Sequence, residues 1–408
     1  MTKTDKRKKS QSIMVDLKQS HCGYYLYNGH YVSDRETLLD LMLLNEDYDA
    51  NLNLYHYNDE VFSAINWKKE PSMSLYHMYV ERAKQLRDQY DYLILAFSGG
   101  SDSNEILEIF LQNNIFIDEI QTVHYETLID RLDDTFIKTH DTLGVLYEYR
   151  GSVLPKLKRI RELSPNTKIN SMDLSNYAYD QIVGKKFDYM GMNHNPTNGM
   201  SLIKPLRIYN YYMHTHNNLN APKKKTAFIR GFEKPWLFVD DDDRLMFRFS
   251  DIPMHGVGRI RSGDVNDIYT LEDFFWSPNY PLIPVKQSHV IKNILLKHPN
   301  LYQLFMDNVA RRGLTEFNQE APNVLDRLYA KMIYYHTNSI EFIAPKPKQN
   351  PELFLINHLQ NDENKAYYSQ MIDEKKTFYL NKYRNIKTQN LLKRHWVTKP
   401  YVVGSLRK

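Results

Sequence analysis

The sequence has a single cysteine, Cys22, among 408 residues. One thiol excludes an intramolecular disulfide, a CxxC redox pair and an iron–sulfur cluster held only by cysteines of one chain. Long apolar runs are also missing, since no stretch approaches the roughly 18 apolar residues that a membrane-spanning helix needs. The basic N-terminal stretch MTKTDKRKKSQS leads into no apolar core, so we do not expect a secretory signal. These absences predict a cytoplasmic protein with no membrane partner, whose chemistry needs no pair of thiols.

The overall composition is that of an ordinary globular protein. Apolar residues make up 42% of the chain and charged residues 25%, which distinguishes it from a disordered chain. The formal net charge of +4 is mildly basic and does not by itself indicate a nucleic-acid partner. The length allows two or more compact units.

Changes in pattern along the chain predict four segments. They are a disordered basic tail at 1–20, a small α/β lobe at 21–70, a larger α/β domain at 71–265 and an all-helical domain at 266–408.

The small lobe is expected to begin with a β-hairpin that turns at Asn28-Gly29, because this dipeptide is the strongest short hairpin signal. A helix should then begin at Ser33 or Asp34, with Glu36 near the capping-box position. A second helix is predicted over 74–89, just before the first strand of the larger domain.

The larger domain alternates strand and helix patterns. Strands are predicted at 93–98, 119–124, 145–149, 187–194 and 226–231, and helices at 102–113, 127–141 and 152–162. Two further strands, in PWLFVD and RLMFRFSD, flank a turn built from Asp240 to Asp243. This alternation is typical of βαβ units, so we expect a doubly wound, mostly parallel sheet.

The stretch YLILAFSGGSDSNEILEIF, residues 92–110, joins the first of these strands to a helix through two glycines and three serines. Ligands of open parallel sheets bind at the carboxyl ends of strands. A helix N-terminus there presents N–H groups and the positive end of the helix dipole to an anion. The structural alternative is a tight turn with Asp102 or Ser103 as N-cap. The loop matches neither GxxxxGK[ST] nor GxGxxG.

The six residues Ser98-Gly99-Gly100-Ser101-Asp102-Ser103 fit the pattern SGGxDS at all five of its fixed positions. In this strand–loop–helix context the stretch resembles the PP-loop of the N-type ATP pyrophosphatases, which have an adenine-nucleotide α-hydrolase-like fold. The resemblance covers roughly residues 91–250. It implies binding of ATP and Mg²⁺ and cleavage between the α- and β-phosphates.

The resemblance also implies roles for individual residues. Ser98, Gly99, Gly100 and Ser103 correspond to the pyrophosphate-binding loop, with Ser101 at the variable position and Asp102 as the magnesium ligand. Adenine would lie at the end of the second strand, which the strand assignment places at Val123, His124 and Tyr125.

A cation is needed to stabilise the leaving pyrophosphate. The asparagine synthetase branch has a second glycine-containing loop for this purpose. The acidic pattern that usually marks that loop is missing from this sequence. IRGFEKPW is the nearest substitute, with Gly231 ending a strand and Lys234 as the candidate catalytic cation. Arg230 is a poorer candidate, because it lies inside the predicted strand.

The resemblance favours an asparagine synthetase-like ligase or amidating enzyme that adenylates a carboxylate or carbonyl, after which ammonia or an amine attacks. The shortage of cysteine argues against the thiolating and sulfonucleotide-reducing members. One alternative is a tRNA- or DNA-base-modifying enzyme, because the C-terminal stretch LLKRHWVTKPYVVGSLRK is basic with interleaved aromatics. A second alternative is a nucleotide-binding module without catalysis. Neither the substrate nor the oligomeric state follows from the sequence.

Overall fold

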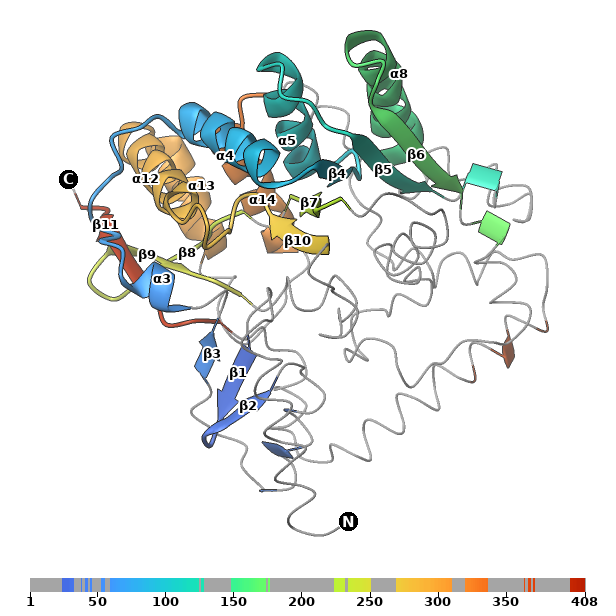
Figure 1. The fold of residues 1–408 in the computed structure, drawn as a ribbon. Coiled ribbons are helices and arrows are strands. Elements are labelled where there is room, and N and C mark those ends of the chain that lie inside the picture. Colours follow the sequence, from blue (N-terminus) through green and yellow to red (C-terminus); the bar gives the residue numbers. More distant parts are fainter. Residues whose placement is uncertain are drawn as a thin grey trace. The chain divides into compact units, whose positions relative to one another are not determined.

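The fold was described from a computed structural model of the chain (Figure 1). The described residues are 24–32, 53–55, 59–124, 126–127, 148–173, 175–176, 224–231, 234–250, 269–309, 320–336 and 397–407, with a few single residues between them. They fall into two compact units. The first draws on Met1–Gln89, Ile229–Tyr335 and Arg394–Lys408, and the second on Tyr90–Phe228 and His336–Lys393.

A five-stranded parallel sheet confirms the prediction of a mixed α/β fold. Its order is β10-β7-β4-β5-β6, comprising β10 (Tyr269–Asp273), β7 (Thr226–Arg230), β4 (Tyr92–Ala96), β5 (Glu119–His124) and β6 (Lys168–Asp173). Leu93, Ile94 and Leu95 are all buried, as expected for a strand covered on both faces. The register pairs Ala96 with Gln121 and His124 with Asp173, so β4, β5 and β6 end at a common edge.

In the second unit, α5 (Ser101–Gln112) and α8 (Leu154–Leu163) lie against the same face of strands β4, β5 and β6 (Figure 1). The strands β4, β5 and β6 lie side by side in chain order, so the sheet grows in one direction. Right-handed crossovers between them then place the intervening helices on one face of the sheet. α5 is unusually deep, with every residue from Ser103 to Phe110 buried.

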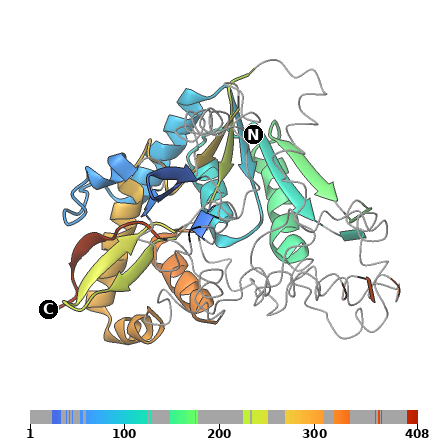
Figure 2. The same cartoon turned by 90° about the horizontal axis from the view of Figure 1, so that it is seen from below.

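In the first unit, α4 (Leu75–Gln89), α12 (Leu282–Lys297), α13 (Pro299–Val309) and α14 (Glu320–Ile333) form a helical layer in which α12 packs against each of the other three. An antiparallel sheet of β8 (Trp236–Val239), β9 (Arg244–Arg248) and β11 (Tyr401–Ser405) adjoins α12 and α13. Figure 2 shows β11 beside β9. Short elements complete this unit: β1 (Tyr24–Tyr27), β2 (His30–Val32), β3 (Asn53–Tyr55) and α3 (Asp59–Ser63).

An aromatic stack holds three distant parts of the first unit together. The Trp67 ring lies 4.7 Å from that of Phe247 on β9 and 4.6 Å from that of Tyr401 on β11, nearly parallel to both. The Trp67 indole N–H also donates to the Phe62 carbonyl at 2.8 Å. Each aromatic pair contributes about 0.5–1.5 kcal/mol beyond burial. The strand β11 is therefore fixed by side chains far from it in sequence.

Several predicted elements are confirmed. The β1–β2 hairpin turns at Asn28 and Gly29, with φ of 47° and 77°, the two positive values that a type I′ turn requires. α4 begins directly after Ser74, whose hydroxyl accepts the His77 N–H at 3.3 Å. The Asp240–Asp243 turn joins β8 to β9.

Two predictions about secondary structure are wrong. The segment 266–408 is not all-helical, because it contains β10 and β11, which are only five residues long and depend on partner strands for their extended form. The expected strand at 145–149 is contradicted where it is described, since Glu148–Val153 forms a π-helix, η2, that runs into α8. The strand β6 was not predicted. Its sequence, KINSMD, has no apolar run because it lies at the partly exposed sheet edge.

Other predictions lie outside the described residues. They are the tail at 1–20, the helix beginning at Ser33 or Asp34, the helix at 127–141 apart from Thr127, and the strand at 187–194. Within the described part of the chain, no helix is long and apolar enough to cross a membrane.

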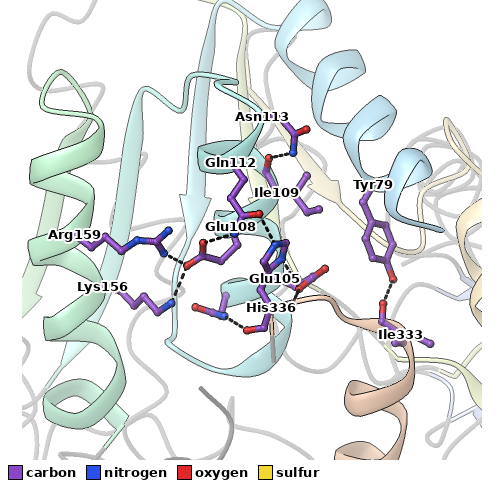
Figure 3. Close-up of polar contacts among 11 residues, drawn as sticks. Tyr79, Glu105, Glu108, Ile109, Gln112, Asn113, Lys156, Arg159, Ile333 and His336 are labelled. Carbon is purple, nitrogen blue, oxygen red and sulfur yellow. Dashed lines mark hydrogen bonds and ion pairs between the residues drawn. The ribbon is translucent and has the colours of Figure 1, made fainter. Parts of the chain in front are cut away.

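Buried Glu108 on α5 fastens this helix to α8 (Figure 3). Its carboxylate accepts hydrogen bonds from Lys156 at 2.8 Å and from Arg159. Burial would raise the pKa of the Glu108 carboxyl, but the hydrogen bonds from these two cations outweigh that effect and hold the pKa below its ordinary value of 4.5.

Replacing Glu108 with Gln should lower the free energy of unfolding by about 1–3 kcal/mol at pH 7, because the hydrogen bonds from Lys156 and Arg159 lose the negative charge that strengthens them. A depressed carboxyl pKa stabilises the folded state above the unfolded-state pKa, and this contribution disappears as pH falls through the folded-state value. The gap between wild type and variant in urea unfolding should therefore shrink below about pH 4.5.

Glu81→Gln is the matched control, because Glu81 pairs with Lys84 at 3.1 Å while both side chains are about half exposed. Its effect should be within about 0.5 kcal/mol. An equal effect of the two substitutions would contradict the role given to Glu108.

Candidate functional site

The loop between β4 and α5 turns the chain through a left-handed glycine into the start of the helix. Gly99 has φ of +79°, in the left-handed region that glycine adopts without strain. Gly100 is the N-cap residue of α5, and having no side chain it offers no oxygen to the first N–H groups of the helix. The N-cap is therefore neither Asp102 nor Ser103, both of which lie in the first turn. α5 is 12 residues long, and its positive dipole end faces this loop.

The serine hydroxyls gather around Gly100. Ser98 Oγ accepts the Gly100 N–H at 3.3 Å and lies 3.3 Å from Ser103 Oγ. Ser103 Oγ also donates to the Gly100 carbonyl at 3.2 Å. Two hydroxyls and a backbone N–H thus lie together at the start of α5, hydrogen-bonded to one another and to the Gly100 carbonyl.

The segment η2 packs against this loop at Gly99. Ser152 Oγ donates to the Gly99 carbonyl at 2.6 Å. A Cβ added to Gly99 would lie 2.7 Å from Val153 Cγ2 and 3.1 Å from Ser152 Oγ. Position 99 therefore requires glycine both for its backbone angle and for the close approach of η2.

A polar cluster occupies the ends of β5 and β6. The His124 ring stacks on Tyr149 with centroids 3.9 Å apart and an interplanar angle of 17°. Tyr149 Oη lies 3.0 Å from Ser171 Oγ on β6. Asp173 Oδ2 lies 4.0 Å from His124 Nδ1 and accepts the Thr127 N–H at 3.1 Å.

The charge states within this cluster follow from burial and hydrogen bonding. Burial lowers the pKa of the His124 imidazole, which the carboxylates of Asp173 and Glu126 only partly oppose, so the ring is neutral at pH 7. For Asp173, burial raises the pKa, but hydrogen bonds from Ser175 and Thr127 outweigh this and keep the carboxyl ionised. Nδ1 of His124 accepts the Glu126 N–H at 3.4 Å, which leaves the ring proton on Nε2.

The predicted site residues fall into three groups. Ser98 to Ser103, Val123 and His124 all lie at the carboxyl ends of β4 and β5 in the second unit. Tyr125 lies outside the described residues. Gly231 and Lys234 follow β7 and belong to the first unit.

Lys234 and Arg230 have different surroundings within the first unit. Lys234 is 6% exposed, and its ammonium lies 5.7 Å from the centroid of the Tyr334 ring. Its predicted catalytic role stays a prediction. The Arg230 guanidinium pairs with buried Asp273.

Sequence reasoning missed Ser152, Tyr149 and Asp173. Ser152 is 53 residues from its partner Gly99, so no local pattern connects them. Tyr149 was assigned to a strand, and Asp173 ends the strand that was not predicted. The one available signal was Gly151-Ser152 at the start of the basic helix predicted over 152–162, which resembles an ordinary helix start.

No group of three or more His, Cys, Asp or Glu side chains among the described residues is arranged to hold a metal ion. No protein-family model matches the chain, and no curated protein matches it either. The loop's own geometry and its motif are therefore what support a function.

Replacing Gly99 with Ala should lower the free energy of unfolding by about 2–5 kcal/mol. A left-handed alanine costs about 1–2 kcal/mol, and overpacking against Val153 adds about 1–3 kcal/mol.

Gly29→Ala is the matched control, because Gly29 has φ of +77° with nothing within 4 Å of an added Cβ. Chemical denaturation of both variants, and of Gly99→Ala combined with Val153→Ala, separates the two costs. A coupling energy near zero would contradict the close-approach explanation.

Proposed function

We propose that the protein is an ATP-dependent, AMP-forming enzyme that adenylates a carboxylate or carbonyl and releases pyrophosphate. Ammonia or an amine then attacks the adenylate, as in asparagine synthetase-like amidating enzymes. The observation that carries this proposal is the loop Ser98–Ser103. It combines the SGGxDS motif with a left-handed Gly99 and a helix start that has no side-chain cap.

The strand order supports the same proposal. Numbered along the chain, the five strands of the parallel sheet run 5-4-1-2-3, so the order reverses at the first strand, β4. In open doubly wound sheets, ligands bind outside the carboxyl ends of the strands at this reversal. The loop follows β4 directly. We propose that the sheet belongs to a doubly wound PP-loop ATP pyrophosphatase domain.

The pyrophosphate portion of ATP fits the loop by its donor set. Backbone N–H groups at the start of α5 and the hydroxyls of Ser98, Ser101 and Ser103 would bind its oxygens. Gly99 and Gly100 let the backbone approach closely. Asp102, in the first turn of α5, would hold Mg²⁺, which proteins commonly bind through one or two carboxylates together with substrate phosphates.

The adenine base is assigned to the end of β5. Val123 and Tyr125 would contact it through their backbone, beside the neutral imidazole of His124. A ring with its proton on Nε2 offers a hydrogen-bond donor and no charge, which suits an uncharged base.

The central experiment measures AMP and pyrophosphate formed from ATP and Mg²⁺, with panels of acids and amines and with or without tRNA or DNA. Asp102→Asn should lower kcat/KM by about 100-fold or more and raise the Mg²⁺ concentration needed for half-maximal rate. Asp88→Asn, at an exposed position on α4, is the control and should leave both unchanged.

The outcomes of this experiment separate the candidate functions. Pyrophosphate release only with nucleic acid would replace the ligase by a base-modifying enzyme. ATP binding without AMP formation under any condition would leave a nucleotide-binding module. Formation of ADP and phosphate would overturn the proposed cleavage between the α- and β-phosphates.

Lys234 is proposed as the cation that stabilises the leaving pyrophosphate. Lys234→Ala should lower kcat by about 100-fold or more, and the loss of its contact with the Tyr334 ring should lower the stability by about 0.5–2 kcal/mol. Tyr334→Leu removes the ring contact but keeps the ammonium, so it serves as the comparison. A normal rate in Lys234→Ala would remove the residue from the site.

A further inference from the structure

The π-helix η2 contacts the ends of three neighbouring strands. Ser152 and Val153 touch Gly99 after β4, Tyr149 stacks on His124 at the end of β5, and the Tyr149 hydroxyl contacts Ser171 on β6. Short π-helical turns are rare and occur frequently at functional sites. This segment therefore joins the loop proposed for pyrophosphate to the strand end proposed for adenine.

The contact with Ser152 fixes the orientation of one peptide group in the loop. The peptide between Gly99 and Gly100 is planar and trans, so its C=O and N–H point in opposite directions. Ser152 Oγ holds the carbonyl oxygen at 2.6 Å. The Gly100 N–H must then point away from η2, toward the side where Ser98 Oγ lies 3.3 Å from it.

This orientation decides the electrostatics of the loop. Without the Ser152 bond, the Gly99 peptide is freer to turn, and glycine's wide range of backbone angles makes such a rotation inexpensive. A carbonyl oxygen turned toward the hydroxyls of Ser98 and Ser103 would repel a phosphate oxygen. The bond from Ser152 thus selects the loop conformation that presents a donor there.

We propose that Ser152 is a positioning residue for pyrophosphate binding, acting through the Gly99 carbonyl. The inference rests on the proposed function and extends it to a residue outside the SGGxDS motif. Tyr149 holds η2 in place by its stack on His124, so the same turn supports both halves of the nucleotide site.

The test is calorimetric titration of inorganic pyrophosphate with Mg²⁺ into the full-length protein, at a temperature where every variant is folded. Ser152→Ala should weaken binding about 5- to 15-fold, which is the expected worth of one hydrogen bond. Ser152→Thr keeps a hydroxyl and should restore the affinity to within about threefold. Hydrogen exchange should show faster exchange of the amides of residues 99–103 in Ser152→Ala.

Ser164→Ala is the matched control. Ser164 directly follows α8, and its hydroxyl lies 2.8 Å from Thr167 Oγ1. This variant loses a comparable hydroxyl contact at the other end of α8 and should bind pyrophosphate as the wild type does.

Each outcome decides between the proposals. Wild-type affinity in Ser152→Ala, or equal weakening in Ser164→Ala, would overturn the positioning role and leave the proposed function standing. Failure of Ser152→Thr to recover binding would also count against it, provided this variant has wild-type stability. If the wild-type protein binds neither pyrophosphate nor ATP, the proposed function fails and the positioning role fails with it.

Discussion

The chain turns from a buried strand into a buried helix within four residues, 97–100, and this reversal is the constraint on which the second unit depends. It requires the left-handed backbone at Gly99, and Val153 packs so closely that no side chain fits at that position. The reversal also brings the N-terminus of α5 to the carboxyl edge of the sheet. Any anion-binding capacity of the loop follows from this arrangement, because the uncapped N–H groups and the helix dipole face the same edge.

Two buried glutamates on α5 keep this helix in place. Glu108 is 3% exposed and is neutralised by Lys156 and Arg159. Glu105 is 1% exposed, and its Oε2 lies 3.0 Å from both the backbone nitrogen and Nδ1 of His336 (Figure 3). An uncompensated buried carboxylate is strongly destabilising, so these contacts favour the observed position of α5. The loop thus leads into a helix that Glu105 and Glu108 hold by polar contacts, which suits a site whose donors must be preorganised.

The sequence predicted the elements whose signals are local. Asn28-Gly29 determines a hairpin and Ser74 marks a helix start through contacts within a few residues, and the strand–loop–helix around Gly99 is continuous in sequence. The strands β6 and β11 and the segment η2 were missed because their conformations depend on distant partners. Tyr401 is held by Trp67, and Tyr149 by His124. His124 was proposed from the resemblance, which places adenine at the end of the second strand, whereas Ser152 has no signal short of the folded structure.

The charges along the sheet edge differ from one end of the proposed site to the other, and this bears on the orientation of a bound nucleotide. The start of α5 after β4 favours negative charge, whereas the ionised carboxylate of Asp173 at the end of β6 disfavours it. Between them, His124 is neutral. A nucleotide placed with its phosphates near β4 and its base near β5 meets a favourable field at one end and an uncharged donor at the other. The reverse placement would bring the phosphates beside Asp173 and leave the donors of the loop facing an uncharged base. The geometry of one turn and the charge of one strand end therefore both favour the proposed placement of the nucleotide.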